Sequence, residues 1–179
     1  MITENTEKLK YPIGRYTKPA AVTTERIEEW KKSIETFPER LRKETENLTD
    51  AELNYRYRPE SWTIRQLIHH CADSHMNAFI RFKLALTEDH PTVKPYDENK
   101  WSELLDTKIG LPDFSVKIIE GLHHRWVLVL QSMSSSDYKK TFYHPENKNT
   151  VSLDECLAQY AWHAEHHLAH IIQAKQMKF

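Results

Sequence analysis

The chain has 179 residues, 39% of them hydrophobic and 28% charged, so it is long enough to bury a core of its own. Lysine and arginine total 25 against 26 acidic residues, which gives a net charge of −1 and no basic stretch suited to nucleic acid. No apolar run approaches the roughly 20 residues of a membrane span, and the polar N-terminus is unlike a secretion signal. A single cytoplasmic domain over residues 1–179 is therefore expected.

The N-terminal part is predicted to be a charged, loose segment followed by an arm and a helix. Residues 1–10 are mostly polar, and Pro12 favours an extended chain after them. A long helix is expected from Thr23 or Thr24, because apolar residues then recur at steps of three and four. Pro38 falls inside this pattern and predicts a kink or a break in the helix.

A second long helix is predicted from about Ile64 to Thr87. Thr63 and Gln66 have the spacing of a capping box, which marks its first turn. Beside its apolar stripe runs a polar one at steps of four, three and four: His70, Ser74, Asn77 and Arg81. These side chains are not the lysines and glutamates of an ordinary solvated face, so they predict a polar cavity.

The connection after this helix is long and is expected to contain a short helix within residues 97–105. A third long helix is predicted to begin at Asp113 or Ser115 and to carry His123 and His124. Neither of these two histidines has another histidine four residues away. They are therefore interpreted as surface or core residues.

A small hairpin is predicted from residues 141–143 and 150–152, which flank a stretch rich in turn formers. Ser152 and Glu155 form a second capping-box pattern, from which a fourth long helix runs almost to the C-terminus. Four long amphipathic helices with one long connection predict an all-α four-helix bundle.

Two cysteines fall within helical patterns. Cys71 lies in the second predicted helix and Cys156 in the fourth. They are interpreted as small buried residues or reduced thiols, in keeping with a cytoplasmic protein, and not as a disulfide framework.

Residues 162–170 of the fourth predicted helix contain four of the eleven histidines of the chain. His163 and His167 lie one turn apart on one face, and so do His166 and His170. With His163 at zero, the apolar side of the helix lies at about +60 to +120°, His167 at about +40° and His166 at about −60°. His163 and His167 are thus expected to line the edge of the core, and His166 to lean to solvent. Neutral imidazoles at this spacing can share a metal ion, although such clusters also occur as plain surface residues.

The position of the glutamate excludes two common metal sites. A zinc peptidase helix places its general-base glutamate directly after the first histidine, where this chain has Ala164. Glu165 comes one residue later and should point away from His163, at about 200°. A di-iron bundle needs a glutamate three residues before a histidine on two helices, and neither the second nor the fourth predicted helix, which carry the candidate ligands, has one.

The third ligand would come from the second predicted helix. His69 leans to its exposed side, while His75 lies near the centre of the apolar stripe. His70 flanks the core and heads the polar stripe. Spacing favours His70 only slightly over His75, for which a hydrogen-bonded core histidine is the alternative interpretation.

Several short motifs together resemble one known family. They are Tyr11-Pro12-Ile13-Gly14, Trp62-Thr63-Ile64-Arg65-Gln66, His69-His70, Ala72-Asp73-Ser74-His75-Met76-Asn77, Arg81-Phe82-Lys83-Leu84, Tyr143-His144-Pro145, and Trp162-His163 with His166-His167 and Ala169-His170-Ile171. In this order, over nearly the whole chain, they resemble the YfiT branch of the DinB superfamily.

The resemblance implies a four-helix bundle that binds one divalent metal ion through His70, His163 and His167. Family members are described as metal-dependent hydrolases, and some relatives transfer low-molecular-weight thiols such as bacillithiol. YfiT-like proteins are typically homodimers. Zinc is the expected ion, with nickel, iron and manganese as alternatives.

Three protein ligands would leave a coordination position open for water or substrate. The expected activity is hydrolysis of a small-molecule substrate, with thiol S-transfer and non-catalytic metal binding in a stress response as alternatives. Ser74, Asn77 and Arg81 could position an anionic substrate, or they could simply bond neighbouring helices. Asp73 could orient a ligand imidazole. No general acid or base is assigned.

Overall fold

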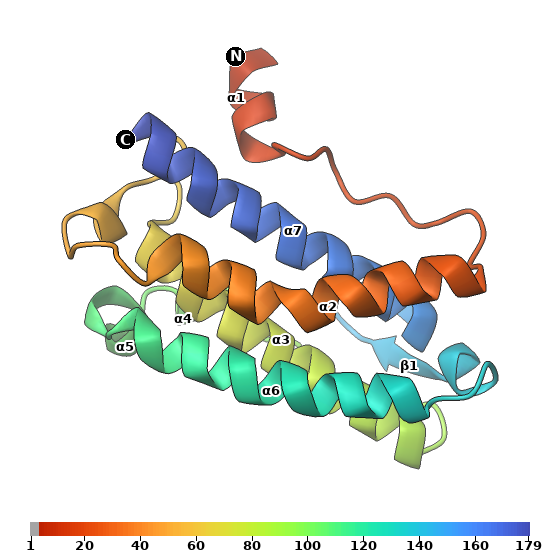
Figure 1. Ribbon diagram of the computed structural model, residues 1–179. Coiled ribbons are helices and arrows are strands. Elements are labelled where there is room, and N and C mark those ends of the chain that lie inside the picture. The colour runs from red at the N-terminus through yellow and green to blue at the C-terminus, as the bar shows by residue number, and fades with distance from the viewer. Residues whose placement is uncertain (1–3) are drawn as a thin grey trace.

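The computed structural model describes residues 4–179, and long helices dominate it (Figure 1). The body consists of α2 (Thr24–Thr45), α3 (Ile64–Thr87), α6 (Pro112–Ser132) and α7 (Leu153–Met177). Shorter elements connect these helices: α1 (Glu4–Lys10), α4 (Glu98–Trp101), α5 (Leu105–Ile109), the 3-10 helices η1 (Glu52–Asn54) and η2 (Asp137–Lys139), and the strands β1 (Thr141–His144) and β2 (Asn149–Ser152). The predicted all-α bundle is confirmed.

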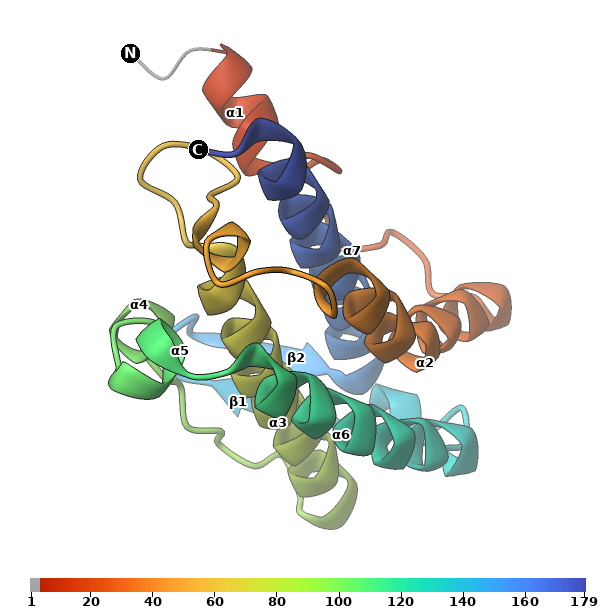
Figure 2. The ribbon, with the colours of Figure 1, turned by 60° about the vertical axis from the view of Figure 1, so that its left-hand side comes forward.

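The four long helices pack in the order α2, α7, α3, α6 around the bundle. Both α2 and α3 contact α6 and α7, so α2 and α3 lie diagonally opposite each other (Figures 1 and 2). Two clusters of buried apolar side chains fill the interior, one around Phe82 and Trp126 and the other around Leu41 and Ile68. None of the helices in the described part of the chain is both long and apolar enough to cross a bilayer.

The predicted capping box of α3 is confirmed, and α7 begins directly after Ser152 as predicted, but the capping-box bonds of Ser152 with Glu155 are not formed. The Thr63 hydroxyl accepts from the Gln66 backbone N–H at 3.2 Å, and the Thr63 N–H donates to Gln66 Oε1 at 3.0 Å. At the start of α7, the Ser152 hydroxyl instead donates to the Asp154 carboxylate, which also accepts from the Glu155 N–H at 2.7 Å. The Asp154 carboxylate thus accepts the Glu155 N–H in place of the Ser152 hydroxyl, while the Glu155 carboxylate accepts a hydrogen bond from Lys18.

Helix α2 continues through Pro38, so the break that was one of the two predicted outcomes does not occur. Proline has no backbone N–H, so it cannot bond the carbonyl four residues earlier, which belongs to Ile34. That carbonyl instead accepts a hydrogen bond from the His123 side chain of α6 at 2.6 Å. The donor that α2 lacks is thus supplied by a neighbouring helix.

The N-terminal segment is more ordered than predicted. Residues 1–3 lie outside the described part, but Glu4–Lys10 form α1, which lies beside the C-terminal half of α7 (Figure 2). The Gln173 amide donates to the Leu9 carbonyl at 2.9 Å, and His170 Nε2 donates to the Lys10 carbonyl at 3.1 Å. The prediction of a loose segment is therefore wrong for residues 4–10.

The connections agree in outline with the predictions. β1 and β2 pair antiparallel, from Thr141 with Ser152 to His144 with Asn149, so the predicted hairpin is confirmed. The long connection holds two short helices, α4 and α5, where one was expected, and α6 begins at Pro112. Both cysteines are buried and unbridged, as predicted.

Candidate metal centre

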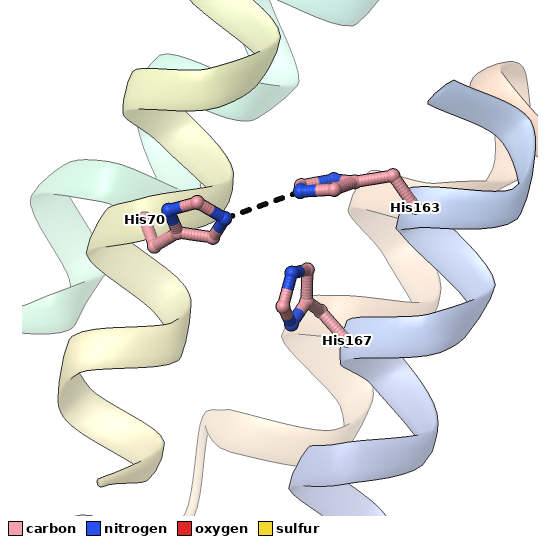
Figure 3. Close-up of side chains that lie close together, drawn as sticks. All are labelled: His70, His163 and His167. Atoms are coloured by element: carbon pink, nitrogen blue, oxygen red, sulfur yellow. Dashed lines mark hydrogen bonds between the residues drawn. The ribbon is translucent and has the colours of Figure 1, made fainter. Parts of the chain in front are cut away.

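Three imidazoles from two adjacent helices meet in the interior (Figure 3). His70 projects from α3, while His163 and His167 project from successive turns of α7. One ring nitrogen of each lies within 4.8 Å of those of the other two, and His70 Nε2 and His163 Nε2 are 3.1 Å apart. Within residues 4–179, no further histidine, cysteine or carboxylate joins this group.

The geometry and chemistry of the trio fit a divalent cation. Imidazole nitrogens bound to a tetrahedral ion lie about 3.3 Å from one another, given metal–nitrogen bonds of about 2.0–2.1 Å. The 3.1 Å separation of His70 and His163 is close to this value. Since the protein supplies three donors, a fourth coordination position is left for an exogenous group.

All three rings are in the protonation state that metal binding needs. Burial lowers the pKa of His70 to about 4. Burial, together with the neighbouring imidazoles, also lowers the pKa values of His163 and His167 well below the ordinary value. At neutral pH each ring is therefore neutral and offers a lone pair without first losing a proton.

His75, the competing candidate for the third ligand, lies behind the trio. Its Nε2 is 3.0 Å from His163 Nδ1, and its Nδ1 is 2.7 Å from His123 Nε2. The ring is fully buried, and both nitrogens have partners. The alternative interpretation of His75 as a hydrogen-bonded core histidine is confirmed. His123 is also buried, whereas His124 is exposed.

Two predictions of exposure are wrong. His166 was expected to lean to solvent, but only 6% of its surface is exposed, because Tyr11 of the N-terminal arm and Trp162 stack on its ring. His69 is 7% exposed. Its Nε2 donates to the Gly110 carbonyl at 3.3 Å, and its Nδ1 accepts from the Ser115 hydroxyl at 2.7 Å. One partner of each ring, Tyr11 for His166 and Gly110 for His69, lies outside the four long helices.

Glu165 points away from the trio, as predicted. Its carboxylate accepts two hydrogen bonds from Arg40, at 2.7 and 2.6 Å, and one from Ser33 at 2.7 Å. Both partners belong to α2. The only glutamate in the histidine-rich stretch therefore joins α7 to α2 and is not available to the site.

A polar cavity of about 530 Å³ opens beside His163. Ser74 and Arg81 line it, together with Tyr160, whose hydroxyl lies 3.4 Å from Ser74 Oγ and 3.5 Å from Arg81 Nη1. Asn77, the remaining member of the predicted substrate set, is not among the lining residues, and its amide donates to the Asp73 carbonyl at 2.9 Å. The structure thus brings Ser74 and Arg81 to the site, while Asn77 bonds within its own helix.

A second cavity, of about 460 Å³, is lined by all three imidazoles of the trio. Aromatic side chains dominate its wall, namely Tyr11, Tyr57, Trp62 and Trp162. This aromatic cavity and the polar cavity share Glu98, Asn99 and His163. A small molecule in either cavity could therefore contact His163.

Sequence patterns did not identify Tyr160 or His123 as parts of the site. Tyr160 lies three residues before His163 and so on the same helical face, where periodicity alone does not distinguish a site phenol from a core aromatic ring. Among the described residues, no hydrogen bond joins the Asp73 carboxylate to a ligand imidazole. The structure instead provides His75 as the partner of a candidate ligand, the imidazole of His163.

Comparisons with known proteins agree with this architecture. The family model described as the DinB superfamily matches residues 33–171. "Putative metal-dependent hydrolase YfiT" of Bacillus subtilis (strain 168) is 43% identical over 165 residues, which are 92% of this chain and 93% of the relative. A protein of Bacillus cereus (strain 03BB102), also named "Putative metal-dependent hydrolase", is 47% identical over 168 residues, which are 94% of this chain and 96% of the relative.

The solved structure of YfiT from Bacillus subtilis, described as having an unusual four-helix bundle topology, superposes with a TM-score of 0.91. Its sequence is 42% identical, and the match covers 94% of this chain and 97% of that one. The likeness therefore extends over the whole bundle, from the first long helix to the histidine-bearing last one.

Proposed function

Because this chain belongs to the YfiT branch of the DinB superfamily, we propose that it is a metal-dependent hydrolase whose single divalent ion is held by His70, His163 and His167. The observation that carries this proposal is the convergence of three neutral imidazoles at the meeting point of two cavities. Zinc is the proposed ion, with nickel as the main alternative, since tris-imidazole sites select metals partly by availability.

A divalent ion held by three imidazoles supplies Lewis acidity, which favours hydroxide formation from water near neutral pH. The chain itself would bind and orient the substrate in the polar cavity. Burial raises the pKa of the Tyr160 phenol, so this group stays protonated. The phenol oxygen can accept hydrogen bonds from the Ser74 hydroxyl and the Arg81 guanidinium. The phenol's own proton can then be donated to a substrate oxygen.

Arg81 is the residue proposed to recognise a negatively charged substrate group. Its guanidinium lines the polar cavity and can make paired hydrogen bonds to a carboxylate. We expect Arg81→Gln to raise KM for an anionic substrate by about 10- to 100-fold, the value of a lost charged hydrogen bond, with little change in metal content.

Steady-state kinetics and metal analysis on the same preparation would check this prediction. Lys83→Gln is the matched control, because Lys83 is an exposed cation on the same helix and does not line the polar cavity. An unchanged KM in Arg81→Gln, or an equal rise in the control, would contradict the assignment.

Thiol S-transfer is the second candidate, and the presence of two cavities favours it. A transfer reaction needs a thiol and an electrophile to meet, and the polar and aromatic cavities share His163. A bound divalent ion would favour the thiolate form of the thiol. Under this alternative, one cavity would hold the thiol and the other the electrophile.

A screen of the metal-loaded protein against esters, amides and electrophiles such as monochlorobimane, with and without a panel of thiols, separates the candidates. Turnover of esters or amides without a thiol supports hydrolysis, and turnover only with a thiol supports transfer. Metal uptake with no turnover would support a non-catalytic binding module and contradict both enzyme proposals.

The protein is further proposed to act in the cytoplasm as a homodimer. Large apolar side chains are exposed on α5, on its flanks and on the first turns of α6: Leu104, Leu105, Ile109, Leu111, Phe114 and Ile118. Exposed apolar groups of this kind favour association.

We expect Phe114→Asp to shift the protein from dimer to monomer in light scattering. A wild-type protein that is monomeric at micromolar concentration would contradict the dimer.

A further inference from the structure

Three histidines and one backbone carbonyl are hydrogen-bonded in series through all four long helices. The Ile34 carbonyl of α2 accepts from His123 Nδ1 of α6 at 2.6 Å. His123 Nε2 is 2.7 Å from His75 Nδ1 of α3, and His75 Nε2 is 3.0 Å from His163 Nδ1 of α7. His163 Nε2 then faces His70 Nε2 at 3.1 Å. The series therefore ends at a proposed metal ligand.

The carbonyl sets the direction of every hydrogen bond in this series. A carbonyl can only accept, so the proton of neutral His123 lies on Nδ1 and its Nε2 is an acceptor. His75 must then donate from Nδ1, which leaves its Nε2 as an acceptor. His163 must in turn donate from Nδ1. Its Nε2 is thus left as a bare lone pair, directed at the other two imidazoles of the trio.

Pro38 explains why this carbonyl is free to begin the series. In an uninterrupted helix the Ile34 carbonyl would accept from the backbone N–H of residue 38. Proline lacks that N–H, so the acceptor is unoccupied within α2. His123 supplies the missing donor, and an interior proline, which is costly in a helix, thereby acquires a role at the site.

Within residues 4–179, the ring nitrogens of His75 and His123 have no hydrogen-bond partners outside the series. His75 is fully buried and His123 is 1% exposed. Phe37 stacks on both rings, with centroid distances of 5.2 and 5.5 Å, and Trp126 meets both edge-on at 6.2 and 5.8 Å. Since these aromatic rings exclude water, the hydrogen bonds to one another are what satisfy the ring nitrogens.

We propose that Ile34, His123 and His75 form a positioning relay that holds His163 in its Nδ1–H tautomer and fixes the orientation of its metal-binding lone pair. This inference rests on the proposed three-histidine metal site, but it is independent of the reaction that the site performs. Outer partners of this kind orient a ligand imidazole and raise its basicity. His75 and His123 are thus positioning residues that act on the ion through His163.

Paired substitutions of His75 test the relay through metal affinity. His75→Leu removes the acceptor at similar volume, whereas His75→Gln can place its amide oxygen near the position of Nε2. By competition with a chromogenic chelator, we expect zinc affinity to fall about 10- to 100-fold in His75→Leu and to be largely restored in His75→Gln. An equal loss of zinc affinity in His75→Leu and His75→Gln would contradict the relay, because a packing defect alone would weaken both variants alike.

A measurement on the unsubstituted protein covers the case in which His75→Leu does not fold. Nitrogen-15 shifts of metal-free, histidine-labelled protein report which ring nitrogen of His163 carries the proton. We expect a protonated Nδ1 and a bare Nε2 in His163, His75 and His123 alike. A proton on Nε2 of His163 would overturn the relay. Neither readout depends on turnover, so failure of the activity screen would leave the relay intact.

Discussion

Replacing His163 or His167 with alanine is expected to remove most of the bound metal, while His166→Ala retains it. Each of the first two variants deletes one of three donors whose nitrogens lie within 4.8 Å of one another. Loss of an outer partner of a ligand costs about 10- to 100-fold in affinity, so loss of a ligand itself should cost more than roughly 100-fold. His166 lies between them in sequence but is not a member of the trio.

Elemental analysis of each purified variant, after equilibration with the same limiting zinc concentration, would check this expectation. His166→Ala is a demanding control, because the ring is buried against Trp162 and its Nδ1 has no hydrogen-bond partner among residues 4–179. His124→Ala, at an exposed position on α6, controls for the loss of any one histidine. If His166→Ala lost its metal and His163→Ala kept it, the assignment of ligands would be wrong.

The metal-free protein is expected to lose stability steeply as the pH falls from about 6.5 towards 4. Burial lowers the pKa values of His70 and His123 to about 4, and those of His75, His163 and His167 well below the ordinary value. In this window the histidines of the unfolded chain bind protons, whereas the buried histidines of the folded chain stay neutral. The free energy of unfolding therefore decreases as the pH is lowered.

The expected loss is large compared with the stability of a domain. Each such imidazole contributes about 1.4 kcal/mol per pH unit within the window, against a total of about 5–15 kcal/mol. Urea unfolding of metal-free protein at pH 7, 6 and 5 would measure this decrease in the free energy of unfolding. Saturating zinc should raise the unfolding free energy at each pH, because the ion binds the folded state. Equal unfolding free energies at pH 7 and pH 5 would show that these rings are not held neutral.

Much of the bundle was predictable because its main signals are local. Apolar residues at steps of three and four are found in all four long helices, and the Thr63–Gln66 pair marked the first turn of α3. The 3.6-residue period also placed His163 and His167 on one face of the last helix. These features require only neighbours in the sequence, which is why they could be recognised.

The remaining features depend on contacts between distant segments. Periodicity gives the face of a helix on which His70 and His75 lie, but it does not give the depth at which a neighbouring helix meets them. His166 was placed in solvent because a helical wheel takes no account of the arm carrying Tyr11, which covers that face. Likewise, Pro38 predicted only a kink or a break, and it is the packing of α6 against α2 that shows His123 bonding the Ile34 carbonyl.

The last residue of the chain, Phe179, is hydrogen-bonded to a segment that borders the aromatic cavity. The Phe179 carbonyl accepts a hydrogen bond from the Arg56 backbone N–H at 2.9 Å, and Arg58, two residues after Arg56, lines the cavity. Lys10, at the end of α1, lines it as well. A polyhistidine purification tag fused after Phe179 would therefore carry competing imidazoles into the neighbourhood of the native ones. Metal stoichiometry and ion preference should accordingly be measured on protein from which such a tag has been cleaved, or on protein purified through a tag without histidine.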